Sequence, residues 1–174
     1  MNQSLSPVAR SAWCLALINS CTPHIELQAS EEQSDFQPWT KLRSKLSTFL
    51  SGELKSAANL ERFFQEFLQW RENYEPADSL NGRITDLCLA ATTAALDMLT
   101  DEECDDTGLI RQTMNDIYTE LHELGGDAEG LQAYWQELDS EWCSALAGVK
   151  QRPLSRTVMQ TIQATEVSPF GLEA

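Results

Sequence analysis

The chain has 174 residues, enough for one domain with a substantial core, and 42% of them are hydrophobic. It carries 27 Asp and Glu against 12 Lys and Arg, which gives a formal net charge of -15. A field of this sign excludes nucleic acid and anionic membranes as direct ligands and favours cations or basic protein surfaces. Because only 22% of the residues are charged, the acidity does not indicate disorder.

The first half of the chain predicts helices with apolar residues at three- and four-residue spacing. Ser6 and Pro7 begin a helix that ends near Pro23, and a short helical turn follows through Leu27. The polar residues 30–34 predict a loop. A second helix is expected over 35–52, and a third, capped by Asn59, carries a broad aromatic face as far as residue 74.

The second half begins with a strongly apolar helix. Residues 79–100 leave almost no polar face and are rich in Ala, so we expect this helix at the centre of the fold. An acidic turn over 101–106 leads into two amphipathic helices, over 109–124 and from Asp127 to about 152, joined by two glycines. Ser155 caps a last short helix. The pattern predicts a single all-α domain, 1–174, a bundle of six or seven helices with less ordered ends at 1–5 and 167–174.

The cysteines and the N-terminus indicate the compartment. Five cysteines form no CxxC pair, which favours reduced thiols in a cytoplasmic protein. The start MNQSLSPVARSAW lacks the cationic and apolar regions of a signal peptide. No stretch approaches the ~18–20 apolar residues of a membrane span. We therefore expect a soluble cytoplasmic protein that does not bind membranes, and the sequence leaves a homo-oligomer open.

Several landmarks occur in a characteristic order. They are the first helix ending at Cys21 and Pro23, the acidic and aromatic helix from Asn59, the Ala-containing segment Asp86–Leu99, the Trp-bearing segment Tyr134–Leu146 and the ending Ser168–Leu172. Together they resemble the YjaG-like family of bacterial all-α proteins, a domain of unknown function. The resemblance covers nearly the full length and implies the fold. It implies no reaction, cofactor or catalytic residue.

The acidic stretch gives the leading functional hypothesis. Fourteen carboxylates lie between Asp97 and Glu141, where Arg111 is the only Lys or Arg, while the rest of the chain is nearly balanced. If the two amphipathic helices form an antiparallel hairpin, their acids make one extended surface for a basic partner, such as a nucleic-acid-binding protein. The residues predicted to bind this partner are Asp105, Asp106, Asp116, Glu120, Glu123, Asp127, Glu137 and Asp139.

Two other interpretations stay open. A small divalent-metal-dependent enzyme would use the carboxylates of Asp116, Glu120 and Glu123 with His122. The di-iron Glu-x-x-His pattern is absent because Thr119 stands three residues before His122, and the EF-hand spacing is absent too. The third interpretation is that the acid serves only solubility. No spacing selects a hydrolytic triad, and no catalytic residue, metal ligand or cofactor is assigned.

Overall fold

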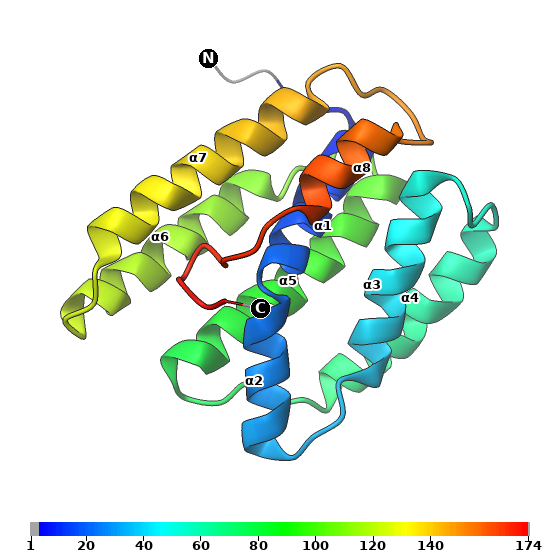
Figure 1. Cartoon of the computed structure of the whole chain (residues 1–174). Coiled ribbons are helices and arrows are strands. Elements are labelled where there is room, and N and C mark those ends of the chain that lie inside the picture. Colours follow the sequence, from blue (N-terminus) through cyan, green and yellow to red (C-terminus); the bar gives the residue numbers. More distant parts are fainter. Residues whose placement is uncertain (1–3, 174) are drawn as a thin grey trace.

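The computed structural model describes residues 4–173, and every regular element in that range is an α-helix, which confirms the all-α fold. No helix formed by these residues is both long and apolar enough to cross a membrane. The helices, labelled in Figure 1, are α1 (Pro7–Ser20), α2 (Thr22–Glu32), α3 (Gln37–Ser51), α4 (Ala57–Glu72), α5 (Leu80–Thr100), α6 (Thr107–Glu123), α7 (Ala128–Leu146) and α8 (Arg156–Gln163).

The described residues form eight helices, against the six or seven expected, and α2 is a full helix where a short turn was predicted. Pro23 lies in its first turn, where the missing N–H costs little. The helix then continues through the predicted loop 30–34 as far as Glu32, whose carboxylate accepts hydrogen bonds from Gln28 and from Tyr74 of the segment after α4. It ends at Gln33, which is left-handed with φ 53°.

Four of the eight helices in the described residues begin at a side-chain cap where the sequence predicts their start. The side chains of Ser6, Ser79, Asp127 and Ser155 each accept a hydrogen bond from the backbone N–H three residues later, at four positions where the sequence predicts a helix to start. The start of α4 is different. Ser56 caps it by accepting from the N–H of Asn59, so the helix begins earlier than the predicted cap.

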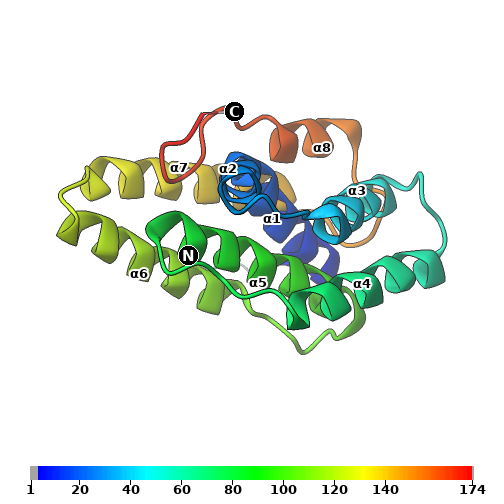
Figure 2. The ribbon, with the colours of Figure 1, turned by 90° about the horizontal axis from the view of Figure 1, so that it is seen from below.

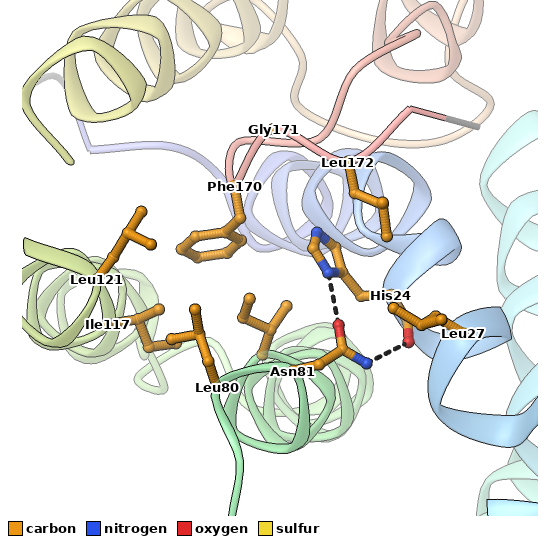
Figure 3. A pocket seen from close by; sticks show the side chains of 10 residues that line it. His24, Leu27, Leu80, Asn81, Ile117, Leu121, Phe170, Gly171 and Leu172 are labelled. Atoms are coloured by element: carbon orange, nitrogen blue, oxygen red, sulfur yellow. Dashed lines mark hydrogen bonds between the residues drawn. The ribbon is translucent and has the colours of Figure 1, made fainter. Parts of the chain in front are cut away.

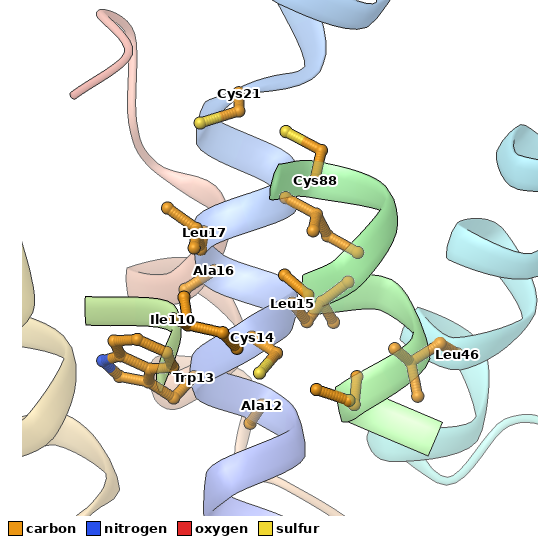
Figure 4. Packing of buried hydrophobic residues seen from close by; sticks show 14 of the residues in the cluster. Ala12, Trp13, Cys14, Leu15, Ala16, Leu17, Cys21, Leu46, Cys88 and Ile110 are labelled. Carbon is orange, nitrogen blue, oxygen red and sulfur yellow. The ribbon is translucent and has the colours of Figure 1, made fainter. Parts of the chain in front are cut away.

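The centre of the fold is shared between α1 and α5. On α1 the segment from Ser11 to Ile18 is fully buried, and in Figure 2 α5 lies below α1 while α7 and α3 flank it. The prediction gave the centre to the Ala-rich α5 alone. In the structure α1 shares this position, because its segment 11–18 is fully buried. Figure 4 shows the contact, where Leu15 of α1 lies toward α5 and the buried thiols of Cys21 and Cys88 face each other.

The aromatic face of α4 packs inside the protein. Phe67 is fully buried, and Trp70 lies between Phe36, with 5.1 Å between ring centroids, and Tyr74, on which it stacks at 5.1 Å. These contacts join α4 to the turn before α3. Trp39 on α3 completes the packing by donating its indole N–H to Thr92 of α5 at 2.9 Å. Leu60, Phe64 and Phe67 of the predicted aromatic face are therefore core, and the other members are partly buried against it.

The C-terminal residues are held against the helices. The sequence predicts a less ordered end over 167–174, but the structure places 167–173 on α2, α6 and α7. Tyr134 donates its hydroxyl to the carbonyl of Val167 at 2.6 Å, and Tyr118 donates to that of Pro169 at 2.7 Å. Residues 1–3 and 174 of the two predicted ends lie outside the described residues.

Candidate functional site

The predicted acidic hairpin exists, but arginines neutralise part of it. Helices α6 and α7 lie antiparallel (Figure 1), and Arg111 of α6 donates two hydrogen bonds of 2.9 Å to Asp139 of α7. Trp13 donates to the same carboxylate at 2.9 Å. Burial alone would raise the pKa of Asp139, but the bonds from Arg111 and Trp13 outweigh it and hold the pKa below its ordinary value. Asp139 therefore holds the hairpin together and offers no free charge.

Two more of the eight predicted partner-binding acids are paired with arginines outside the hairpin. Arg83 of α5 donates from Nε and Nη2 to the carboxylate of Glu120. Arg10 of α1 lies 3.5 Å from Asp105, which also accepts from the backbone and hydroxyl of Thr107. Sequence reasoning missed both pairings because the arginines come from helices distant along the chain.

The other five acids do not form one surface. Asp106 and Asp127 lie at opposite ends of the hairpin, separated by the length of α6, about 25 Å at 1.5 Å per residue. Glu137 lies beside Tyr134, whose hydroxyl bonds to the C-terminal segment, whereas Asp116 faces α5. Glu123 is exposed near the turn. Because Asp105, Glu120 and Asp139 are paired with arginines, the extended acidic surface expected from the sequence is interrupted.

The residues of the metal hypothesis also stay apart. Glu120 is bound by Arg83, and His122 is exposed two residues further on, about 200° around the helix from it. Within residues 4–173, no three His, Cys, Asp or Glu side chains converge as a set able to hold a metal ion. The hypothesis therefore lacks an assembled ligand set in the described part of the chain.

Two of the predicted acids do meet in a groove between α5 and α6. The groove has a volume of about 330 Å³ and is lined by Arg83, Asp86, Leu87, Ala90, Thr113, Asp116, Ile117 and Glu120. Arg83 is occupied by Glu120 and Asp78, whereas Asp86 and Asp116 form no ion pair with any described residue. Leu87, Ala90 and Ile117 provide an apolar lining. The groove thus offers two uncompensated carboxylates over an apolar surface.

Asp86 was not among the predicted site residues. It lies on α5, outside the acidic stretch, and is partly buried. The available signal was its position: Arg83 and Asp86 are the charged residues in the first half of a largely apolar helix. A charged side chain in such a helix indicates that the face carrying it is open to solvent.

A second hollow lies on another side of α5, next to the C-terminal segment (Figure 3). It has a volume of about 180 Å³ and is mostly apolar, with Leu27, Leu80, Ile84, Ile117, Leu121, Phe170 and Leu172 among its lining residues. Its polar residues are His24 and Asn81, and both make hydrogen bonds. We call it the His24 pocket. His24 lies in the first turn of α2 and is 4% exposed.

His24 stands in a chain of hydrogen bonds. Its Nδ1 lies 2.8 Å from Oδ1 of Asn81, and its Nε2 lies 2.7 Å from Oγ of Ser168. Asn81 donates from Nδ2 to the carbonyl of His24 and to Oε1 of Gln28, so Oδ1 must be the acceptor. Nδ1 of His24 therefore carries the proton, and Nε2 accepts from the Ser168 hydroxyl.

The order Ser168, His24, Asn81 matches the roles of a hydrolytic triad, but the serine is not placed to react. Its side chain is buried, and its Oγ accepts the backbone N–H groups of Phe170 and Leu172, each at 3.1 Å. A nucleophile needs access to substrate and free N–H donors for the oxyanion. Here the nearby N–H groups already bond to the Oγ of Ser168, so the arrangement holds the C-terminal segment against α2.

Comparison with known proteins gives no relative from which a role could be transferred. No protein family matches the chain, no curated protein is significantly similar to it, and no solved structure matches its fold significantly. Any role must therefore be argued from the groove between α5 and α6 and from the His24 pocket.

Proposed function

We propose that the protein is a binding module that accepts a basic side chain of a partner protein in the groove between α5 and α6. The observation that carries the proposal is that Asp86 and Asp116 face this groove and form no ion pair with any described residue, because Arg83 is paired with Glu120 and Asp78. A lysine or arginine from a partner would supply the missing positive charge. The proposal keeps the basic partner expected from the sequence, but it places the binding site in the α5–α6 groove instead of on the α6–α7 hairpin.

The lining of the groove suits a long cationic side chain. Three carboxylates and one arginine give the lining a formal charge of -2. The methylene stem of a lysine or arginine can lie along Leu87, Ala90 and Ile117 while its charged end reaches the carboxylates. The surrounding acid adds long-range attraction, because the chain as a whole carries -15.

The partner class follows from this chemistry. Basic protein surfaces fit, including those of nucleic-acid-binding proteins, whereas nucleic acid itself would be repelled. Membership of the YjaG-like family and a cytoplasmic location stay predictions. A metal-dependent enzyme is not proposed, because Glu120 is engaged by Arg83 and His122 points away from it.

The test is the affinity of the full chain for an acetylated and amidated oligolysine peptide, measured by calorimetry. The double variant Asp86→Asn with Asp116→Asn should bind about tenfold more weakly, because the peptide loses two close charge partners. Raising NaCl from about 50 to about 300 mM should weaken wild-type binding, because salt screens exposed charges.

A matched control removes the same total charge elsewhere. Glu129 and Glu141 are exposed on α7 and do not line the groove. The variant Glu129→Gln with Glu141→Gln should retain affinity within about twofold, because only the diffuse field changes. Equal losses in the two double variants would contradict the proposal and favour a purely solubilising role for the acid.

A further inference from the structure

The segment 167–173, here called the strap, crosses α2, α6 and α7 as one wall of the His24 pocket. Phe170 lies between the rings of His24, at 5.8 Å between centroids, and Tyr118, at 5.0 Å. Phe170, Gly171 and Leu172 line the pocket directly (Figure 3). Removing the strap would therefore expose the apolar residues of α2, α5 and α6 beneath it.

Ser168 organises the turn of the strap. Its Oγ accepts from the N–H groups of Phe170 and Leu172, and its own backbone N–H donates to the carbonyl of Leu172 at 2.9 Å. A hydroxyl oxygen has two acceptor lone pairs and one proton. Both lone pairs are used inside the strap, so the remaining proton is what Ser168 can offer to α2. Nε2 of His24 receives it.

This bond depends on the charge of His24. Neutral His24, with its proton on Nδ1, presents a lone pair at Nε2 to the Ser168 hydroxyl. The imidazolium carries a proton on both nitrogens and accepts nothing. Its Nε2 proton would then face an oxygen that already accepts two hydrogen bonds, so the contact between α2 and the strap would be lost.

Among residues 4–173, no carboxylate forms a hydrogen bond or ion pair with His24. The groups that meet it are neutral: Asn81 from α5, Ser168 and Phe170 from the strap, and beyond Phe170 the phenol of Tyr118 from α6. The charged residues of the surrounding elements are engaged elsewhere or exposed. Glu26 interacts electrostatically with Arg43, and Glu32 accepts hydrogen bonds from Gln28 and Tyr74. Arg83 and Asp86 line the groove between α5 and α6. Glu173 is exposed.

We propose that the strap is a pH-operated cover of the His24 pocket. Neutral His24 fastens it to α2, beside the tyrosine bonds from α6 and α7, and protonation of His24 releases the strap from α2. The inference does not depend on the proposed function, since it concerns a different side of α5. It assigns the pocket a closed state at neutral pH and an opened, wider state in acid.

The direction of the pH dependence follows from burial. Desolvation lowers the pKa of His24 below its ordinary value of 6.5, and the bond to Asn81 opposes this only in part. The closed state thus binds the proton more weakly than the open state. Closure is unaffected by pH above about 6.5 and weakens below it, up to about tenfold per pH unit, until the closed state itself is protonated.

The experiment follows the backbone N–H signals of Phe170 and Leu172 by NMR in the full chain, between about pH 7.5 and pH 5. In the wild type these signals should shift with the same midpoint as the His24 ring. Their hydrogen exchange, corrected for the intrinsic effect of pH, should accelerate as the strap opens. Strap signals that stay fixed while His24 titrates would overturn the proposal, as would a His24 ring that never titrates over this range.

The second histidine of the chain supplies the control. His122 is exposed on α6, so His122→Gln should leave the strap response unchanged. His24→Gln should remove it, because the titrating group is gone. A strap transition that persists in His24→Gln would contradict the proposal. If this variant fails to fold, the two midpoints within the wild type still decide.

Discussion

Two hollows lie on different sides of α5, the groove between α5 and α6 and the His24 pocket. They differ in whether their polar groups have partners within the protein. In the groove, Asp86 and Asp116 have no cationic partner within the described chain. In the pocket, each nitrogen of His24 and the amide of Asn81 are bonded. Unpaired charge at a surface costs little stability and is available to a ligand. Hydrogen-bonded groups in the interior hold the structure together, and removing one partner lowers the free energy of unfolding.

The largest effect should come from removing Asn81. Asn81→Ala leaves the Nδ1 proton of His24, the carbonyl of His24 and Oε1 of Gln28 without their partner in a mostly buried site. We expect the free energy of unfolding, measured in urea, to fall by about 2–4 kcal/mol, because each unsatisfied buried group keeps its desolvation cost.

Asn115 provides a matched control for this change. It is exposed on α6 and bonds to Gln132 of α7 at 3.0 Å. Asn115→Ala should cost less than about 0.5 kcal/mol, because water replaces the lost partner. If the two asparagine variants are equally stable, the contrast between pocket and surface is lost.

A smaller effect separates paired from unpaired acid. Asp139→Asn weakens the bonds from Arg111 and Trp13, and we expect it to lower the free energy of unfolding by about 1–3 kcal/mol at pH 7. Asp116→Asn, the same chemical change in the groove, should alter it by less than about 0.5 kcal/mol. Chemical denaturation of the two variants checks the difference, and a larger loss in Asp116→Asn would reverse the account.

The stability contributed by the bonds to Asp139 depends on pH in a defined direction. Because the pKa of Asp139 in the folded protein lies below its ordinary value of 3.8, its contribution is complete above pH 3.8 and is lost as pH falls through the folded value. The wild type should therefore lose stability faster than Asp139→Asn as the pH is lowered below about 4.

The features that could be predicted from the sequence are those decided by neighbouring residues. The helix starts at Ser6 and Ser79 and the aromatic face of α4 follow from residue type and spacing, and all are confirmed. The length of α2 could not be predicted. It depends in part on the bond from Tyr74 to Glu32, which joins residues 42 positions apart.

The candidate sites also combine features that neighbouring residues decide with features that depend on distant residues. The acidic character of α6 and α7 is plain in the sequence, but its distribution depends on Arg10 and Arg83, which reach Asp105 and Glu120 from other helices. The His24 contact to Ser168 spans 144 positions, so no local pattern announces it. Charge can be counted along a chain, whereas pairing is settled by tertiary packing.

The most direct test of the groove is to map where a basic ligand binds. Titration of the ¹⁵N-labelled chain with the oligolysine peptide, at low salt, should shift the backbone signals of Arg83, Asp86, Asp116 and Glu120 most strongly. The signals of Glu129 and Glu137 should change little. Shifts spread evenly over α6 and α7, or centred on α7 instead of the α5–α6 groove, would contradict the account.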